Sequence, residues 1–384
     1  SFDIPYPANY GGVIDVFFRI KALSQRGVKI HLHCFEYGRE HSEYLESFCY
    51  SVNYYKRETK ITKLFNPLPY IVCSRDCEML RANLLKDDYP ILLEGLHCCS
   101  ILTHSEFNDR NIIVRAHNVE HEYYDHLAKA EVDSKKKMYL KQEVDKLQKF
   151  ESVLAKASAI LAISQKDYDY FSEKYKNVHK VTAYNAYTEV DILEGSSDYV
   201  LYHGNLSVAE NYSAAEKAID DGKNFLFVYT ASLDGLLHDK VKEPSEVGTK
   251  LSGMNPPHHL QKVIEEVPNV ELVDSPDDQT LFDLIRHAHI NILVTEQATG
   301  LKLKLLNTLF NGRFCLVNDK MVEGLDVNGL CYVVNDQNAI RFAVQELMPK
   351  RFDAHQIERR RKNMKNFYDI EEATDLLLEL ITQN

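Results

Sequence analysis

The chain has 384 residues, of which 45% are hydrophobic and 27% are charged, proportions that are typical of a globular protein. This length suits two domains of α/β type better than a single core. The formal net charge of −12 argues against a general nucleic-acid-binding protein, and no segment reaches the roughly 20 apolar residues that a membrane-spanning helix needs.

The eight cysteines form no C-x-x-C pair, and several lie inside apolar runs such as Ile91–Cys99 and Phe314–Val317. This pattern favours buried free thiols over a zinc site or a disulfide framework. Free thiols indicate a reducing compartment, and no signal peptide is recognisable after Ser1. We therefore expect a cytoplasmic protein.

Apolar runs of strand type alternate with helical periodicity along the chain, which is the pattern of parallel α/β sheets. In the first half, apolar residues from Val13 to Leu23 recur at helical spacing after Gly11-Gly12, and Gly27 stops that helix. A strand is expected at residues 28–35, and an amphipathic helix is expected at 134–157. Further strands are expected at Ile91–Leu93, Ile112–Arg115 and Ala159–Ile163.

The second half repeats the alternation after a polar stretch at Asp191–Ser197, which indicates a domain boundary. We predict an N-terminal Rossmann-like domain at 1–192, a second Rossmann-like domain at 193–348, and a helical segment at 349–384 that packs back toward the first domain. The expected strands are Tyr199–His203, Phe225–Tyr229, Val270–Val273, Ile290–Val294 and Phe314–Val317, and Gln356–Thr382 has helical character.

Two strand ends in the second half have features of a phosphate-binding edge. The strand that ends at His203 continues through Gly204 and Asn205 into a helix-like segment, and helix N-termini bind anions. Ser252-Gly253 forms an expected turn before a helix that starts near His258. At Gly204 the alternative is that glycine serves backbone conformation only, and at Ser252–Pro257 it is that the prolines serve the start of the helix.

A third segment places Lys304 in the first turn of an expected helix, after a polar turn that contains Glu296, Thr299 and Gly300. The helix macrodipole disfavours a lysine there unless a bound anion neutralises it. Asn307 follows one turn later. The alternative is an ordinary solvated lysine.

In the first half, His117 lies just past the carboxyl end of a strand, where open α/β sheets bind ligands. A histidine beside the anomeric carbon of a sugar can donate a hydrogen bond to the sugar or to a leaving diphosphate. The alternative is a core histidine bonded to the backbone.

Together these residues resemble the retaining glycosyltransferases of family 4 over essentially the whole chain. The resemblance implies a GT-B fold, in which two Rossmann-like domains with parallel sheets face a cleft. It also implies Gly11 and Gly12 on the acceptor side and His117 and Lys304 as catalytic residues. The donor-binding residues that it implies are Gly204, Asn205, Gly253, Glu296, Thr299, Gly300 and Asn307.

The chain departs from that family in three respects. Thr299 and Asn307 stand where many members have two glutamates; Asn307 can still bind ribose hydroxyls, and Glu296 can replace the first glutamate. No Arg/Lys pair follows the second-domain glycine, and about twenty polar residues extend one loop. Two alternatives therefore stay open: a catalytically degenerate GT-B relative that binds a nucleotide sugar or a partner, and a GT-B epimerase that uses Glu94, Glu120 or Glu296.

The resemblance predicts transfer of a hexosyl unit, with retention, from a nucleotide-diphosphate sugar to a glycan or lipid-linked acceptor in polysaccharide biosynthesis. No cofactor beyond that co-substrate and no metal are expected, because Asp167-Tyr168-Asp169 reads as a solvated helix face. Aromatic and basic residues at 54–65, together with Lys135–Lys137, suggest peripheral contact with anionic lipids at the inner membrane face. A solvated surface is the alternative.

Overall fold

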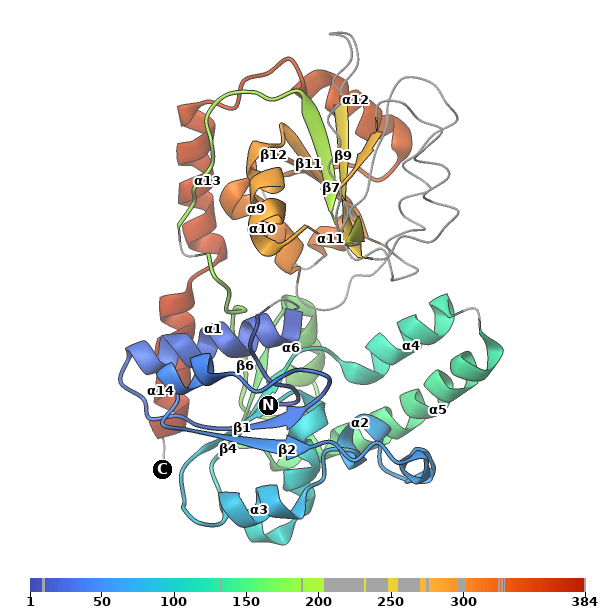
Figure 1. Cartoon of the computed structure of the whole chain (residues 1–384), viewed down its shortest axis with the longest axis vertical. Coiled ribbons are helices and arrows are strands. Elements are labelled where there is room, and N and C mark those ends of the chain that lie inside the picture. The colour runs from blue at the N-terminus through green and yellow to red at the C-terminus, as the bar shows by residue number, and fades with distance from the viewer. Residues whose placement is uncertain are drawn as a thin grey trace. The chain divides into compact units, whose positions relative to one another are not determined.

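The structure is a computed structural model that describes residues 1–8, 11–131, 133–187, 189–203, 231–232, 248–254, 270–273, 276–295, 302–323, 325, 327 and 329–382. It divides into two compact units (Figure 1). The first comprises Ser1–Ala186 and Asp369–Asn384, and the second comprises the described residues between them. The expected strand Phe225–Tyr229 lies outside the described residues.

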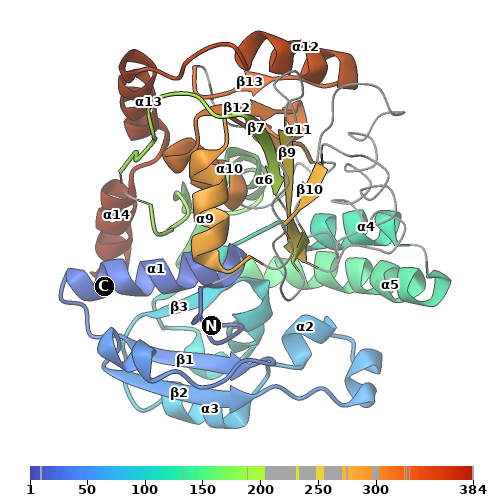
Figure 2. The same cartoon turned by 45° about the horizontal axis from the view of Figure 1, so that its top comes forward.

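The first unit is built on parallel strands throughout. One sheet has the order β3-β4-β5-β6, and β1 pairs with β2 in a separate ladder (Figure 2). The sheet's apolar side chains, such as those of Ile113 and Leu161, are fully buried between layers. The strands are β1 (His31–Glu36), β2 (Ser51–Lys56), β3 (Ile91–Glu94), β4 (Ile112–Ala116), β5 (Ala159–Ala162) and β6 (Val178–Lys180).

Helices cover these sheets, and α4 and α5 pack against each other as neighbours (Figure 1). The α-helices are α1 (Gly11–Gln25), α2 (Tyr70–Cys73), α3 (Glu78–Leu84), α4 (Glu120–Ala130), α5 (Ser134–Phe150), α6 (Gln165–Ser172) and α14 (Ile370–Thr382). Short 3-10 helices are η1 (Glu43–Ser47), η2 (Ile61–Phe65), η3 (Leu96–Thr103), η4 (Ser105–Phe107) and η5 (Glu151–Lys156).

The second unit has a sheet of seven described strands in the order β10-β9-β7-β11-β12-β13, with β8 beside β9, and every pairing is parallel. The strands are β7 (Tyr199–His203), β8 (Ala231–Ser232), β9 (Gly248–Met254), β10 (Val270–Leu272), β11 (Ile290–Leu293), β12 (Phe314–Val317) and β13 (Tyr332–Val333). Its described helices are α9 (Asp278–His287), α10 (Leu303–Asn311), α11 (Asp319–Val322), α12 (Gln337–Leu347) and α13 (Ala354–Phe367).

The parallel α/β architecture predicted from the sequence is confirmed, but element boundaries differ. The strand expected from residue 28 begins at His31, because Val28 is part of the cap that follows α1. The N–H of Val28 donates to the carbonyl of Leu23 at 3.1 Å, and Gly27 takes a φ of +80°. This is a Schellman cap, which needs glycine at the left-handed position.

Three further expectations are corrected. The helix expected at 134–157 ends at Phe150 and tightens into η5. The terminal helical segment is two helices, because Tyr368 is extended at φ −148° and ψ 107° and interrupts the ladder between α13 and α14. Gly253 does not lie in a turn: it lies within β9, paired with Ala231 of β8.

Helix α14 belongs to the first unit and lies beside α1 (Figure 1). Its Leu377 is fully buried in a cluster with Ile113 and Leu161 of the sheet. At the surface, Arg26 pairs with Asp375 at 2.6 Å and with Glu371. The last helix of the chain is thus part of the first unit's core. None of the described helices is both long and apolar enough to cross a membrane.

Leu377→Ala is therefore expected to lower the free energy of unfolding by about 2–5 kcal/mol, because it leaves a cavity in the first unit's core. Glu372→Ala, on the exposed face of α14, should change it by less than about 0.5 kcal/mol. Urea unfolding followed by circular dichroism measures both. Equal effects of the two substitutions would contradict the placement of α14.

Candidate functional site

The carboxyl ends of β3 and β4 meet at one edge of the first unit's sheet. Glu94 ends β3 and pairs in register with Arg115 of β4. Gly95 then turns the chain at a φ of +66°, and its N–H donates to the carbonyl of Arg115 at 2.8 Å. His117 follows the end of β4. Ligands of open parallel sheets bind at this edge, as the position of His117 in the sequence suggested.

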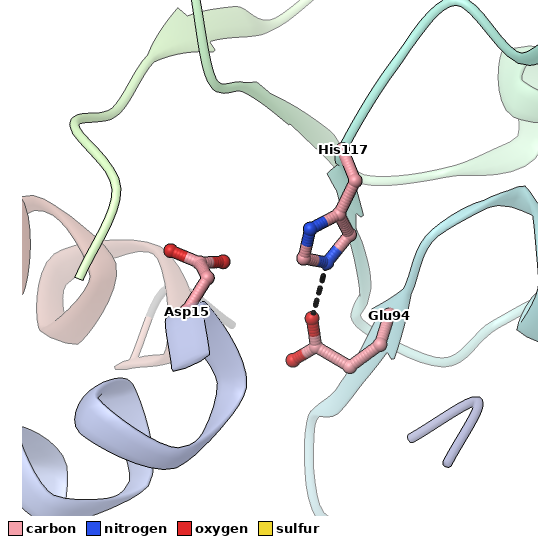
Figure 3. A group of neighbouring side chains, drawn as sticks. All are labelled: Asp15, Glu94 and His117. Carbon is pink, nitrogen blue, oxygen red and sulfur yellow. Dashed lines mark hydrogen bonds and ion pairs between the residues drawn. The ribbon is translucent and has the colours of Figure 1, made fainter. Parts of the chain in front are cut away.

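The ring of His117 is oriented by Glu94. His117 is buried, and its Nε2 lies 3.1 Å from Oε2 of Glu94 (Figure 3). Burial alone would raise the pKa of Glu94, but the charge of Arg19 and the hydrogen bond from His117 outweigh it and lower that pKa. The ionised carboxylate can only accept, so Nε2 of His117 carries a hydrogen and donates it to Glu94.

Behind this pair lies a buried ion network that joins α1 to the sheet. Asp15 and Arg19 are four residues apart on α1, and Nη1 of Arg19 lies 2.6 Å from Oδ2 of Asp15. The other terminal nitrogen of Arg19 binds Oε1 of Glu94. Arg115 donates to both oxygens of Asp15, from Nη2 at 3.0 Å and from Nε at 3.1 Å. The backbone N–H of Tyr184 donates to the same carboxylate at 2.8 Å.

These contacts explain the charge states of the network. Burial would raise the pKa of Asp15, but Arg115 and Arg19 hold it well below its usual range. Arg19 responds in the opposite sense: burial opposes its charge, while Asp15 and Glu94 raise its pKa. Two carboxylates therefore balance two guanidinium groups inside the unit, which is the condition under which buried charges are tolerated.

Asp15, Glu94 and His117 also bring one oxygen or nitrogen each within 4.8 Å of one another, a spacing compatible with a metal ion (Figure 3). The donor set does not fit one. All four carboxylate oxygens already accept hydrogen bonds from Arg19, Arg115, His117 or the backbone. A cation placed there would meet two guanidinium groups whose charges already neutralise the carboxylates.

Gly12, in the first turn of α1, borders the same edge. A Cβ at Gly12 would lie 2.6 Å from Cζ of Phe2, so glycine lets the Phe2 ring approach the helix. That ring lies 5.3 Å from the ring of His97 and 5.6 Å from that of His117, measured between centroids. The Gly11-Gly12 pair expected on the acceptor side is thus near His117, although it starts a helix instead of forming a turn.

In the second unit, the carboxyl ends of β7 and β11 form the corresponding edge. Tyr202, near the end of β7, is fully buried, and its hydroxyl donates to the carbonyl of Val294 after β11 at 3.1 Å. Asn318 after β12 binds the N–H and the carbonyl of Thr295, at 3.1 and 2.7 Å. Side chains thus hold three neighbouring strand ends together.

Lys304 lies at this second edge. Helix α10 begins at Leu303, so Lys304 is in its first turn, which contains no acidic residue. Its Nζ lies 3.5 Å from the hydroxyl of Tyr202. His203 is buried beside it, and burial first and the charge of Lys304 second lower the pKa of His203 to about 3. This edge therefore carries a lysine cation next to a neutral histidine.

The remaining residues predicted from the sequence divide into two groups. Asn307 lies in α10 and accepts a hydrogen bond from Nδ2 of Asn311 at 2.9 Å through its side-chain oxygen. Gly253 lies within β9, one residue before the strand ends at Met254. Gly204, Asn205, Glu296, Thr299 and Gly300 lie outside the described residues, and their expected contacts stay predictions.

The sequence analysis missed Asp15, Arg19 and Arg115. The signal was present for the first two: both lie on the face of α1 that buries Val13, Val16 and Ile20. A charged pair at i,i+4 within a buried stripe requires partners of opposite charge from elsewhere in the fold. Glu94, considered only as an epimerase carboxylate, is one of those partners.

Comparisons with known proteins support the fold. No family model matches the chain. A relative named as an uncharacterized 44.6 kDa protein in the cps region of Klebsiella pneumoniae is 26% identical over 344 residues, which cover 85% of this chain and 84% of that protein.

Among solved structures, the chain is similar to sucrose-phosphate synthase from Thermosynechococcus elongatus, with a TM-score of 0.64 and 13% identity over 97% of this chain and 92% of that one. A glycosyltransferase from Rickettsia africae has a TM-score of 0.61 and 11% identity, over 99% of this chain and 96% of that one. HepE from Anabaena, in complex with UDP and glucose, has a TM-score of 0.59 and 10% identity, over 98% of this chain and 96% of that one. These neighbours are GT-B glycosyltransferases, and the chain has their α/β fold of two Rossmann-like domains.

Asp15→Asn is expected to destabilise the protein by about 3–5 kcal/mol at pH 7, because it leaves buried guanidinium charge uncompensated. Asp125→Asn, at an exposed pair with Lys129, should cost less than about 1 kcal/mol. The folded pKa of Asp15 lies below the unfolded value of 3.8, so its contribution is complete above about pH 5 and falls as the pH drops further.

Urea unfolding of wild type and Asp15→Asn between pH 3 and pH 7 tests this sign. The gap between their unfolding free energies should be constant near neutrality and narrow in acid. A gap that widens as the pH falls would contradict the ion network.

Proposed function

We propose that this chain is a metal-independent glycosyltransferase that moves a hexosyl unit from a nucleotide-diphosphate sugar to a glycan or lipid-linked acceptor, with retention. The observation that carries the proposal is Lys304. It adds a positive charge to the first turn of α10, where the helix macrodipole is also positive and the turn itself contains no acidic residue. Two positive features that coincide at a strand edge of a GT-B fold favour a dianionic ligand such as a diphosphate.

Lys304 would act on the leaving group. When the bond between the anomeric carbon and the diphosphate breaks, the electron pair stays on the phosphate oxygen, and Lys304 and helix-terminal N–H groups stabilise that charge. The acceptor hydroxyl forms the new bond to the anomeric carbon, and its proton passes to the leaving phosphate oxygen. In this proposal Gly204, Asn205, Gly253, Glu296, Thr299, Gly300 and Asn307 bind the donor.

His117 would orient a sugar by accepting a hydrogen bond. Because Glu94 accepts from Nε2–H, the form of the ring that acts in this proposal is the one with the lone pair on Nδ1. A sugar hydroxyl can donate to that nitrogen. This differs from the donor role expected from the sequence, and it follows from a carboxylate that the sequence did not place beside His117.

The comparisons guide the choice of substrates. The HepE structure holds UDP and glucose, so UDP-glucose is the first donor to test. The relative from a cps region supports polysaccharide biosynthesis as the setting. Of the three carboxylates that a GT-B epimerase would use, Glu94 is bound by Arg19 and His117 and is not available for proton transfer to a sugar.

Lys304→Ala is expected to weaken donor binding by tenfold or more, about 1.4 kcal/mol, because it removes the cation beside the diphosphate. Thermal unfolding with UDP, GDP, ADP and their glucose conjugates measures this, since a ligand at 100 times its Kd adds about 2.7 kcal/mol of stability. Lys350→Ala, at an exposed pair with Glu346 in the same unit, is the control.

One nucleotide series should stabilise wild type and Lys350→Ala alike, and Lys304→Ala much less. No stabilisation by any nucleotide would overturn the donor site. Stabilisation without turnover in the presence of acceptors would identify the catalytically degenerate relative instead.

We also propose that the first unit contacts anionic lipid at the inner face of the membrane. Phe65 and Ile61 on η2 are 86% and 73% exposed, and Met138 on α5 is 60% exposed. Lys146 of α5 donates to the carbonyl of Leu64 at 2.9 Å, which holds η2 against α5. Positive charge around these exposed apolar side chains comes from exposed lysines just before η2 and on α5, namely Lys60, Lys135, Lys136 and Lys141.

Phe65→Ser should reduce the fraction that sediments with phosphatidylglycerol-containing vesicles several-fold, and added salt should reduce wild-type binding as well. Phe342→Ser is the control, because Phe342 is 66% exposed on α12 of the second unit. Absence of wild-type protein from the vesicle pellet at low salt would reject the lipid contact.

A further inference from the structure

A second His–Glu pair lies at the same strand edge as His117 and Glu94. His97 follows β3 in η3, and Glu120 begins α4. Nδ1 of His97 lies 3.8 Å from Oε1 of Glu120, which is too long for a hydrogen bond between them. No described group bonds to either atom. His97 and Glu120 are therefore not hydrogen-bonded to each other, whereas His117 and Glu94 are.

Burial makes these two open positions unusual. The side chain of Glu120 is 3% exposed and that of His97 is 21% exposed. Buried side-chain nitrogens and oxygens in proteins nearly always have partners, because an unpaired one loses its hydration without replacement. Two such atoms that face each other indicate a position for a third polar atom.

The backbone at Gly95 lies close to both histidines. A Cβ at Gly95 would lie 2.9 Å from Nδ1 of His97 and 3.7 Å from Cδ2 of His117. Glycine also satisfies the φ of +66° there. Glycine at position 95 thus lets the rings of both histidines approach the same stretch of backbone, which places the second pair next to His117.

The charges around the second pair differ from those around the first. Within the described part of the chain no guanidinium pairs with Glu120: Arg75 donates instead to the carbonyls of Phe2 and Ile71, at 2.9 and 2.8 Å. Burial raises the pKa of Glu120 to about 7; a hydrogen bond with Asn118 opposes this, the charge of Asp167 adds to it, and Arg75 opposes it.

His97 is kept neutral as well. Burial lowers its pKa well below the usual value, and the charges of Arg75, His117 and Arg57 act in the same direction. Below neutral pH the pair therefore presents one donor, the carboxyl O–H, and one acceptor, the imidazole lone pair. A single hydroxyl group, which both donates and accepts, satisfies this combination.

We infer that His97 and Glu120 form a subsite for a hydroxyl group of the sugar acceptor. The inference rests on the proposed function and specifies how the first unit recognises its substrate. The hydroxyl oxygen lies within hydrogen-bond distance of both atoms, donates to Nδ1 of His97 and accepts from the carboxyl of Glu120. A neutral subsite selects a hydroxyl over a phosphate or an ammonium group, since neither charge is compensated there.

The subsite is sensitive to pH. When Glu120 ionises, the hydroxyl meets two acceptors and can donate to only one, so acceptor binding weakens as the pH rises through about 7. Asn118 and Asp167, Arg75 from the segment after α2, and His97 itself are the polar and charged groups that face the carboxyl of Glu120. Glutamine at this position keeps a donor at every pH.

The experiment uses the full chain with histidine labelled by nitrogen-15 and methyl α-glucoside, methyl β-glucoside and methyl β-galactoside as probes. At pH 6, at least one glycoside is expected to shift the Nδ1 resonance of His97 until the shift saturates. The Kd derived from that titration should be about tenfold higher at pH 8.5. Glu120→Gln should bind equally at both pH values. Glu120→Ala should bind about tenfold more weakly at pH 6, and Glu122→Gln, on the same helix, should match wild type.

Kinetics with the same glycosides as acceptors separates this inference from the proposed function. His97→Asn should raise the acceptor KM about tenfold and leave the donor KM unchanged. A wild type that shifts His97 but turns over no donor would refute the transferase while supporting the subsite. No shift of His97 by any glycoside, which would mean a bound water only, or an unaltered pH dependence in Glu120→Gln, would overturn the subsite.

Discussion

The pairing of Asp15 with Arg19 and Arg115 is the constraint on which the rest of the first unit's strand edge depends. It places an ionised carboxylate from α1 against a guanidinium from the middle of the sheet, with no exposed side chain among them. A buried ion pair contributes little net stability, but removing one partner is costly. The main effect of the network is therefore on the positions of the elements and not on stability. It fixes the rotation of α1 against β4, and this in turn fixes the position of Gly12 and Phe2 beside His117.

The same network determines a protonation state some distance away. Arg19 bridges Asp15 and Glu94, and its charge keeps Glu94 ionised despite burial. An ionised Glu94 in turn fixes the tautomer of His117. Glu120, equally buried but without a guanidinium, has its pKa raised instead. Two neighbouring His–Glu pairs thus differ in chemistry because one arginine reaches only the first, which is how a fold separates the roles of similar groups.

The sequence predicted the parts of this molecule that depend on local pattern. Apolar runs located β4 and β7, and the end of β4 located His117; the first turn of α10 at Lys304 was also confirmed. It could not supply the partners of Asp15 and Arg19, which lie 100 and 75 residues away in Arg115 and Glu94. The break at Tyr368 carries no glycine or proline, so helical periodicity ran through it.

The two strand edges are complementary in charge to the two halves of the proposed reaction. The first unit balances its buried charges and has hydrogen-bonding positions at His117, His97 and Glu120, which suits hydroxyl groups. The second unit places Lys304 beside a neutral histidine, which suits a diphosphate. A lysine cation near the first unit's edge would disturb the balanced ion network there. A neutral edge in the second unit would not stabilise a leaving phosphate. Within the proposed function, the distribution of arginine and lysine therefore assigns acceptor and donor to separate units before any contact with substrate.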